Sequence, residues 1–264
     1  SFWLGILVAM LLAALFALLL GLPTLRLRAD YLAITTIAAA EILRLIVRSG
    51  AATDLSGGPF GLQSIANTFF ELSPFPIGQR YGAGLLEYSG GQLWVMVVTW
   101  ALVVLGAVFT FLLMRSPWGR VLKSIREDED AARSLGKNVY AFKLQSLVIG
   151  GVFGGLGGLM FAVAGQSANA DSYQPVQTFF LYTIVILGGA ATVLGPIVGA
   201  MIFFFLRAGL DAFLREADFL PSFITSGAST GAVVLATMGA VLMLLMAFRP
   251  QGMFGSRREM VLDA

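Results

Sequence analysis

The sequence predicts an all-α, polytopic membrane protein with about seven transmembrane helices, and three observations support this prediction. Hydrophobic residues make up 58% of the 264 residues and charged residues only 12%, which is far from the composition of soluble domains. Long apolar runs alternate with polar segments, and a membrane span needs about 20 residues. The one long segment rich in both charge signs, residues 115–143, lies between two apolar runs. We therefore expect one transmembrane domain over residues 1–264.

The composition also restricts the chemistry. The chain contains no Cys and no His, which excludes disulfide bonds, histidine proton relays and Cys/His metal sites within it. The sequence has no Gly-Lys-Ser/Thr phosphate-binding loop, so we expect no ATP hydrolysis and no bound cofactor in this chain. The net charge of +2 does not indicate nucleic acid, and we expect no such partner.

Residues 2–22 form the first predicted span. Proline cannot donate a backbone hydrogen bond, so Pro23 is predicted to end this helix, and Arg26 and Arg28 follow in a short turn. Small residues recur every four positions and form one stripe that permits close helix packing: Gly5, Ala9, Ala13, Ala17 and Gly21.

Residues 31–47 form a shorter helix with three charged side chains. Glu41, Arg44 and Arg48 are spaced i, i+3 and i+7, which places them on one face. Two interpretations remain open. Glu41 lies near mid-membrane, where an ionisable group needs a partner, or the helix ends at the outer interface. Under the first interpretation, Glu41 and Arg44 belong to the translocation path.

Residues 49–91 are polar and rich in Gly and Pro, and we predict an extracytoplasmic loop. Ser56, Gly57 and Gly58, followed by Pro59, predict a sharp bend. This bend is a candidate gate, or a docking surface for a binding protein. The alternative is an ordinary turn.

The predicted span at residues 140–165 contains two neighbouring glycine stripes. Gly150, Gly154 and Gly158 form one stripe, and Gly151 and Gly155 form the other. Such stripes allow close contact with two partners, or sliding of one helix across another.

A hairpin hinged at Gly195 and Pro196 is predicted after this span. The remaining predicted spans are residues 92–114, 178–194, 196–213 and 231–248.

Residues 115–143 are predicted to form one or two short helices in water between two spans. Pro117 suits the first turn of a helix because no N–H is left unpaired there. Gly136 and Asn138 predict a helix stop, since both tolerate the left-handed conformation. An ordinary charged cytoplasmic loop is the alternative.

The spacing Asp130-Ala131-Ala132, three residues, Gly136 resembles the EAA loop of ABC-importer permeases, with Asp130 in place of Glu. The longer segment SPWGRVLKSIREDEDAARSLGKNVYAFKL is similar to the version in LivM-type permeases of branched-chain amino acid importers. Three further segments show the same resemblance: GLPTLRLRADYLAITTIAAAEILRLIVRSG, LSGGPFGL and LGGAATVLGPIVGA. LivM-type permeases usually carry further N-terminal helices, and this chain opens with Ser1 directly in an apolar run. We therefore expect N-terminal helices to be missing.

The resemblance implies a permease subunit that works by alternating access in the lipid bilayer. The implied partners are a second homologous permease, two ABC ATPase subunits that bind ATP and Mg, and an extracytoplasmic substrate-binding protein. In this family the EAA loop is the coupling helix that docks into a groove of the ATPase. The coupling residues implied here are Ile125, Arg126, Glu127, Asp128, Glu129, Asp130, Ala131, Ala132, Leu135 and Gly136. We expect Ile125, Ala132 and Leu135 to enter the groove while the charged residues surround it.

The distribution of positive charge predicts the orientation. If residues 115–143 are cytoplasmic, alternating spans place residue 1 outside and the C-terminus inside the plasma membrane of a prokaryote. Most of the 17 Lys and Arg residues then lie on the cytoplasmic side, as the positive-inside rule requires.

Three alternative functions remain open at this point. Related ABC permeases for urea or short amides are the nearest. A self-sufficient channel or secondary transporter could use Glu41 as a coupling carboxylate but would not need an EAA-like loop. An intramembrane hydrolase would need a nucleophile with a base, or paired Asp residues at membrane depth, whereas Asp211 supplies one carboxylate rather than a pair.

Overall fold

The computed structural model describes residues 2–27, 29–76, 79–82, 87–190, 192–216, 227–248 and 252–254. These residues are mainly helical, and they divide into two compact units, Ser1–Pro175 and Val176–Ala264, which are described separately. Four helices of the described residues are long and apolar enough to cross a membrane. Arg28, Arg249 and the residues beyond Phe254 lie outside the described part of the chain.

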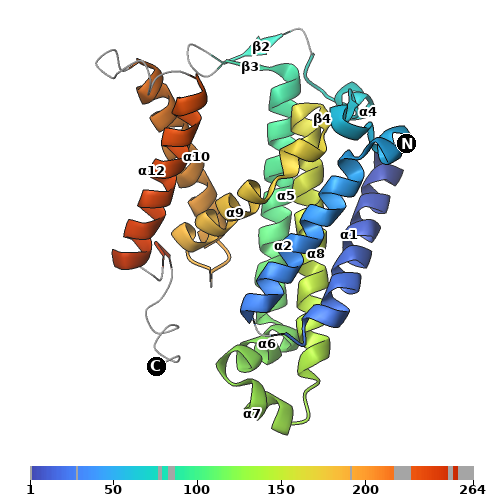
Figure 1. Ribbon diagram of the computed structural model, residues 1–264, viewed down its shortest axis with the longest axis vertical. Helices are drawn as coiled ribbons and strands as arrows, with labels where there is room; N and C mark the ends of the chain where they lie inside the picture. Colours follow the sequence, from blue (N-terminus) through green and yellow to red (C-terminus); the bar gives the residue numbers. More distant parts are fainter. Residues whose placement is uncertain are drawn as a thin grey trace. The chain divides into compact units, whose positions relative to one another are not determined.

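The first unit contains four long helices among its described residues: α1 (Phe2–Thr24), α2 (Ala29–Arg48), α5 (Gly90–Arg115) and α8 (Val139–Gly165). Two short helices, α6 (Pro117–Glu127) and α7 (Glu129–Ser134), connect α5 to α8. Figure 1 shows α6 and α7 beyond one end of α5 and α8, with α4 and β4 at the opposite end. We call residues 116–138 the short-helix end of this unit.

The opposite end is formed by residues 49–76, 79–82 and 87–91 together with residues 166–173, and we call it the loop end. Its elements before α5 are η1 (Gly50–Ala52), α3 (Thr53–Ser56), η2 (Gly58–Phe60), β1 (Leu62–Gln63), α4 (Asn67–Glu71), β2 (Arg80–Tyr81) and β3 (Tyr88–Ser89). After α8 come β4 (Ser167–Ala168) and η4 (Ala170–Tyr173). β1 pairs with β4 and β2 with β3, both antiparallel.

Helices α1 and α8 pack closely through small residues. A Cβ added to Gly151 would lie 2.8 Å from the Cβ of Ala17, and one added to Gly155 would lie 2.8 Å from the Cβ of Ala13. Both distances are too short for two carbon atoms in contact. The glycines of α8 therefore set the distance to the small-residue stripe of α1.

The first helix continues past Pro23, contrary to the predicted end. α1 includes Pro23 and ends at Thr24, whose hydroxyl donates to the carbonyl oxygen of Leu20 at 2.6 Å. A proline in the last turn removes a single hydrogen bond from the helix, so the helix can extend slightly beyond it.

The loop end is attached to the helices by a second apolar cluster. Its buried members are Ala66, Phe69, Met160 and Val163. The indole N–H of Trp94 in α5 donates to the carbonyl oxygen of Phe69 at 2.9 Å. These contacts hold α4 against α5 and α8.

The second unit contains α9 (Pro175–Gly188), α10 (Gly195–Glu216) and α12 (Gly227–Phe248) among its described residues. Its buried core consists of Ile184, Leu187, Phe203 and Leu214. The backbone N–H of Met253 donates to the carbonyl oxygen of Leu187 at 3.0 Å, and that of Phe254 donates to Gly188 at 3.1 Å. Residues 252–254 therefore close the last turn of α9.

The hairpin between α9 and α10 differs from the prediction. α9 ends at Gly188, and Gly195 and Pro196 are the first residues of α10 rather than the hinge. Gly189 has a φ of +110°, which leaves the helical conformation. The hydroxyl oxygen of Thr192 accepts the N–H of Gly195 at 2.9 Å. The turn therefore lies between Gly188 and Gly195, and the hydropathy of the sequence did not separate it from α9 because most of its residues are apolar.

Candidate functional site

The short-helix end has the helix boundaries that its sequence predicts. α6 starts at Pro117, and the hydroxyl of its N-cap Ser116 accepts the N–H of Gly119 at 3.4 Å. Asp128 separates the two helices and caps α7, because its carboxylate accepts the N–H of Ala131 at 2.9 Å. Gly136 has a φ of +77°, as expected for a helix stop.

Two of the three apolar residues expected to contact a partner are buried inside the chain. Ala132 is 2% exposed and Ile125 is 7% exposed, and both pack against Val139 at the start of α8. They therefore hold α6, α7 and α8 together and cannot enter a groove of another protein. The sequence indicated an apolar face correctly, but it did not show that α8 covers that face.

The exposed surface of the short-helix end is different from the expected one. Leu135 is 79% exposed and projects from the end of α7. No described atom lies within 4 Å of a Cβ added to Gly136. Ala131 is also exposed, and Glu129 is half-buried. The other charged residues expected at the coupling surface are exposed: Arg126, Glu127, Asp128 and Asp130.

An ion-pair network fixes α7 to α8. Glu129 accepts hydrogen bonds from Lys143 at 2.5 Å and from Arg133 at 2.9 Å. Arg133 also donates to Asp130 at 3.0 Å. The network connects α7 to the first turns of α8, so the two short helices and α8 form one packed body.

A second charged cluster lies at the loop end. Arg44 donates two hydrogen bonds to Glu41, at 2.6 and 2.9 Å, and one to Asp171 at 3.0 Å. Arg48 also reaches Asp171, at 3.4 Å. The cluster joins the last turns of α2 to η4, which follows α8. This position favours the interpretation that Glu41 lies near the end of its helix.

Sequence reasoning did not include Asp171 in this cluster. The residue is 127 positions from Arg44, so no helical spacing connects the two. A usable signal was that Asp171 is the acidic residue of the polar connection after α8.

The predicted bend at Ser56, Gly57 and Gly58 is present. Gly57 and Gly58 have φ angles of +73° and +58°, which glycine adopts without strain. The Ser56 hydroxyl donates to the carbonyl oxygen of Val47 at 2.6 Å and attaches the bend to the end of α2. A Cβ on Gly57 would collide with the carbonyl group of Gly61. The bend is tightly built, and its role as a gate or docking surface stays a prediction.

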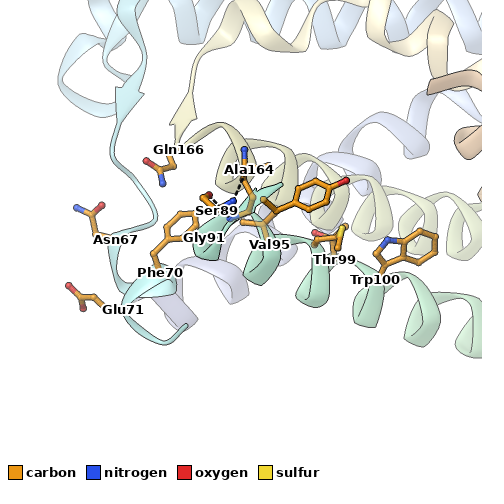
Figure 2. A pocket seen from close by; sticks show the side chains of 13 residues that line it. Asn67, Phe70, Glu71, Ser89, Gly91, Val95, Thr99, Trp100, Ala164 and Gln166 are labelled. Carbon is orange, nitrogen blue, oxygen red and sulfur yellow. Dashed lines mark hydrogen bonds between the residues drawn. The ribbon is translucent and has the colours of Figure 1, made fainter. Parts of the chain in front are cut away.

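A cavity of about 860 Å³ opens at the loop end, and sequence reasoning did not predict it. Figure 2 shows that its lining residues extend along α5 from Gly91 to Trp100. The lining residues are Asn67, Phe70, Glu71, Tyr88, Ser89, Gly91, Gln92, Val95, Met96, Thr99, Trp100, Ala164 and Gln166. Neither the charged cluster nor the bend belongs to this set.

The glycine stripes of α8 have different environments. Gly151 and Gly155 face α1, as described above, whereas no described atom lies within 4 Å of a Cβ added to Gly150 or Gly154. Gly158 lies under Tyr173, whose hydroxyl donates to the Gly158 carbonyl at 2.9 Å. Packing among the described residues of this chain therefore explains only the Gly151 and Gly155 stripe as a helix contact.

The curated proteins to which the chain is similar include permease proteins of transport systems. LivM, the permease protein of the high-affinity branched-chain amino acid transport system of Escherichia coli (strain K12), is 32% identical over 98% of this chain, which spans 58% of that relative. A probable LivM permease of Methanocaldococcus jannaschii is 24% identical over 94% of this chain and 68% of the relative. The guanosine ABC transporter permease NupQ of Bacillus subtilis is 30% identical over 61% of this chain and 48% of the relative.

No solved structure matches the chain. A model of the family described as "Branched-chain amino acid transport system / permease component" matches residues 1–248. The match covers nearly the whole chain, as the resemblance of its four segments predicted, and the chain therefore belongs to the family of permease components of branched-chain amino acid transport systems.

Proposed function

We propose that this chain is a membrane-spanning permease subunit of an ATP-driven importer for branched-chain amino acids in the plasma membrane of a prokaryote. Its proposed partners are a second homologous permease, two ATPase subunits that bind ATP and Mg, and an extracytoplasmic binding protein. The ATPases drive alternating access, and this chain supplies helices that have two arrangements. The relatives that cover more than nine-tenths of the chain are named for branched-chain amino acid transport, which favours this substrate class over urea and short amides.

The observation that carries the proposal is the construction of the short-helix end. Two short helices lie between two long apolar helices and are fixed to α8 by a buried apolar cluster and by ion pairs. Such a packed body transmits a displacement to α8 instead of absorbing it. Its outer surface presents one large exposed apolar side chain, Leu135, surrounded by charges. A small apolar anchor with a charged rim suits a groove on another protein.

Three contacts support the proposed orientation. The hydroxyl of Tyr140 donates to the carbonyl oxygen of Leu22 at 2.8 Å, which joins two segments assigned to the cytoplasmic side. The pairing of β1 with β4 joins two segments assigned to the outside. In the second unit, the N–H of Met253, which follows the last predicted span, donates to the carbonyl oxygen of Leu187 near the inner end of α9. Each contact agrees with a chain that crosses the membrane alternately.

The orientation also requires α2, α9 and α12 to enter the membrane. α9 has only 14 residues, which is shorter than the ~20 residues of a full span. Within this proposal, the turn at residues 189–194 completes the crossing together with residues 252–254, which close the end of α9.

Replacement of the exposed anchor tests the coupling role. In the complete protein, Leu135→Asp places a charge where the ATPase groove needs an apolar group, so we expect at least a tenfold loss of ATPase co-purification and of substrate-stimulated ATP hydrolysis. Leu55→Asp is the matched control, because Leu55 is 87% exposed and belongs to the loop end. This control should leave ATPase co-purification unchanged. If Leu135→Asp retained ATPase co-purification and substrate-stimulated ATP hydrolysis at the wild-type level, the short-helix end would not be the coupling element.

A further inference from the structure

The cavity at the loop end follows one face of α5. After Gly91, its α5 residues are Gln92, Val95, Met96, Thr99 and Trp100, which fall at i, i+3, i+4, i+7 and i+8 and therefore share one side of the helix. Figure 2 shows Val95, Thr99 and Trp100 leading away from Phe70 and Gln166 along the helix. The cavity is therefore a path along a helix that is long and apolar enough to span the membrane.

The hydrogen bonds of Gln92 identify the group that it offers to the cavity. The Gln92 carbonyl oxygen accepts the backbone N–H of Ser89 at 2.9 Å, and the Ser89 hydroxyl accepts the N–H of Gln92 at 3.3 Å. Ser89 N–H is a donor, so the amide atom facing it must be the oxygen. The NH₂ group has no hydrogen-bond partner among the described residues. Gln92 therefore offers a donor, which suits a carboxylate ligand.

The other lining residues extend this pattern. Glu71 at the end of α4 is the charged side chain of the lining, and a carboxylate suits an ammonium group. Figure 2 shows Glu71 and Asn67 together at one end of the cavity and Trp100 at the other. Val95, Met96 and Trp100 form an apolar wall along α5. The lining therefore has a polar mouth and an apolar continuation.

Gln166 has a backbone conformation that is uncommon for its residue type. It caps α8 with a φ of +52°, and its carbonyl oxygen accepts the N–H of Ser64 at 2.8 Å. A non-glycine residue in the left-handed region is strained, and such residues cluster at functional positions. The side-chain amide of Gln166 lines the cavity and has no hydrogen-bond partner among the described residues.

From these observations we infer that the cavity is a binding subsite for a zwitterionic amino acid with an aliphatic side chain, at the outer entrance of the translocation path. Gln92 and Gln166 donate to its carboxylate, Glu71 attracts its ammonium group, and the wall of Val95, Met96 and Trp100 contacts its side chain. The volume of about 860 Å³ falls within the range of small-molecule sites and leaves room for water. This inference rests on the proposed function.

Protection of a single cysteine measures occupancy directly. The chain contains no cysteine, so Thr99→Cys in the complete importer, reconstituted in liposomes, gives one reactive thiol of this subunit in the cavity. We expect an impermeant thiol reagent to label it, and saturating L-leucine to slow the labelling at least fivefold. Leucinol lacks the carboxylate and 4-methylpentanoate lacks the ammonium group, so neither should protect. Leu55→Cys, outside the cavity, should react at one rate with and without leucine.

Two outcomes of this experiment would overturn the inference. If L-leucine, leucinol and 4-methylpentanoate all slow the labelling equally, the cavity is an apolar or lipid site. A cysteine at position 99 that the aqueous reagent does not reach would show that lipid or another helix fills the cavity.

Two substitutions separate ligand contact from folding. Gln92→Glu keeps the carbonyl-type acceptor of the capping box, but replaces the donor with a negative charge. Gln166→Gly keeps the left-handed cap, which glycine adopts readily, and removes the amide. In the Thr99→Cys background, we expect Gln92→Glu to raise the leucine concentration for half-maximal protection at least tenfold, and Gln166→Gly severalfold. Unchanged protection in both variants would contradict the inference.

Leucine uptake by the unmodified importer separates the two proposals. If the importer takes up leucine but the cavity variants behave as wild type, the subsite is wrong and the proposed function stands. If the unmodified importer does not take up leucine, the proposed substrate class is wrong and the subsite fails with it.

Discussion

The two ends of the α5 and α8 pair differ in how completely they are filled. At the short-helix end, Ile125, Ala132 and Val139 fill the space between three helices, and Glu129 connects α7 to Lys143 of α8. At the loop end, a buried apolar cluster around Phe69 and the ion pairs of Asp171 also hold the connections, but a cavity of about 860 Å³ remains open beside them.

Under the proposed function, this difference separates two mechanical tasks. A segment that passes motion from a soluble partner to a membrane helix has to be packed, because voids would absorb the displacement. An end that admits a solute has to keep space and polar groups without internal partners. The chain places the first construction at the end assigned to the cytoplasm and the second at the end assigned to the outside.

The largest effect is expected from overpacking the short-helix end. Ala132 is 2% exposed, so Ala132→Trp has no room and should destabilise the packing of α6 and α7 by at least ~1–3 kcal/mol. Limited proteolysis at residues 115–143 measures the loss of packing, and we expect faster cleavage there. The ATPase activity of the assembled importer should fall as well. Ala131→Trp is the matched control because Ala131 is exposed. It should interfere with docking and leave protease resistance intact. Equal protease resistance in both variants would show that the end is not packed as described.

A smaller effect is expected from the two glycine stripes. Gly155→Leu forces a side chain against Ala13 of α1, whereas Gly154→Leu projects into space that no described atom occupies. We expect Gly155→Leu to destabilise the purified subunit by ~1–3 kcal/mol and Gly154→Leu to change its thermal midpoint little. Comparable losses in the isolated subunit would contradict this assignment of the faces. A loss for Gly154→Leu that appears only in the assembled importer would identify the second permease at that face.

The smallest effects are expected from single charges at the two ends. Asp171→Asn removes two ion pairs of the loop end, to Arg44 and Arg48, and should lower the thermal midpoint by less than Gly155→Leu does. Asp130→Asn, at an 89% exposed side chain, should leave the midpoint unchanged and slow ATPase association in a salt-dependent manner. Added salt should reduce the difference in thermal midpoint between Asp171→Asn and the wild type, and the difference in ATPase association rate between Asp130→Asn and the wild type. A thermal effect of Asp130→Asn larger than that of Asp171→Asn would reverse the expected order.

Glu41→Gln extends this test to the second carboxylate that Arg44 binds. Under the mid-membrane interpretation it lowers transport more than expression. The structure places Glu41 beside Arg44 in a cluster at the loop end, so we expect little change in either. A selective loss of transport would restore the mid-membrane interpretation.

Much of the fold was predictable from local patterns. The positions of α1, α2, α5 and α8 follow from the apolar runs, and the starts and stops at Pro117 and Gly136 follow from backbone chemistry. These features depend on residues close together in sequence. The end of α9 was missed because an apolar run continues from the helix into the turn at residues 189–194, and hydropathy does not distinguish the two.

The candidate sites were predictable only in part, because they depend on contacts between distant segments. By itself, the sequence determined the membrane class, the charged segment between two apolar helices and the family resemblance, since all of these are local in the chain. Only the tertiary structure decided that Ala132 is buried while Leu135 is exposed, and that Asp171 reaches Arg44. It also decided that α4, α5 and α8 enclose a cavity. The physical reason is that burial and ion pairing depend on which elements pack together. Residues 127 positions apart share no sequence periodicity from which their contact could be predicted.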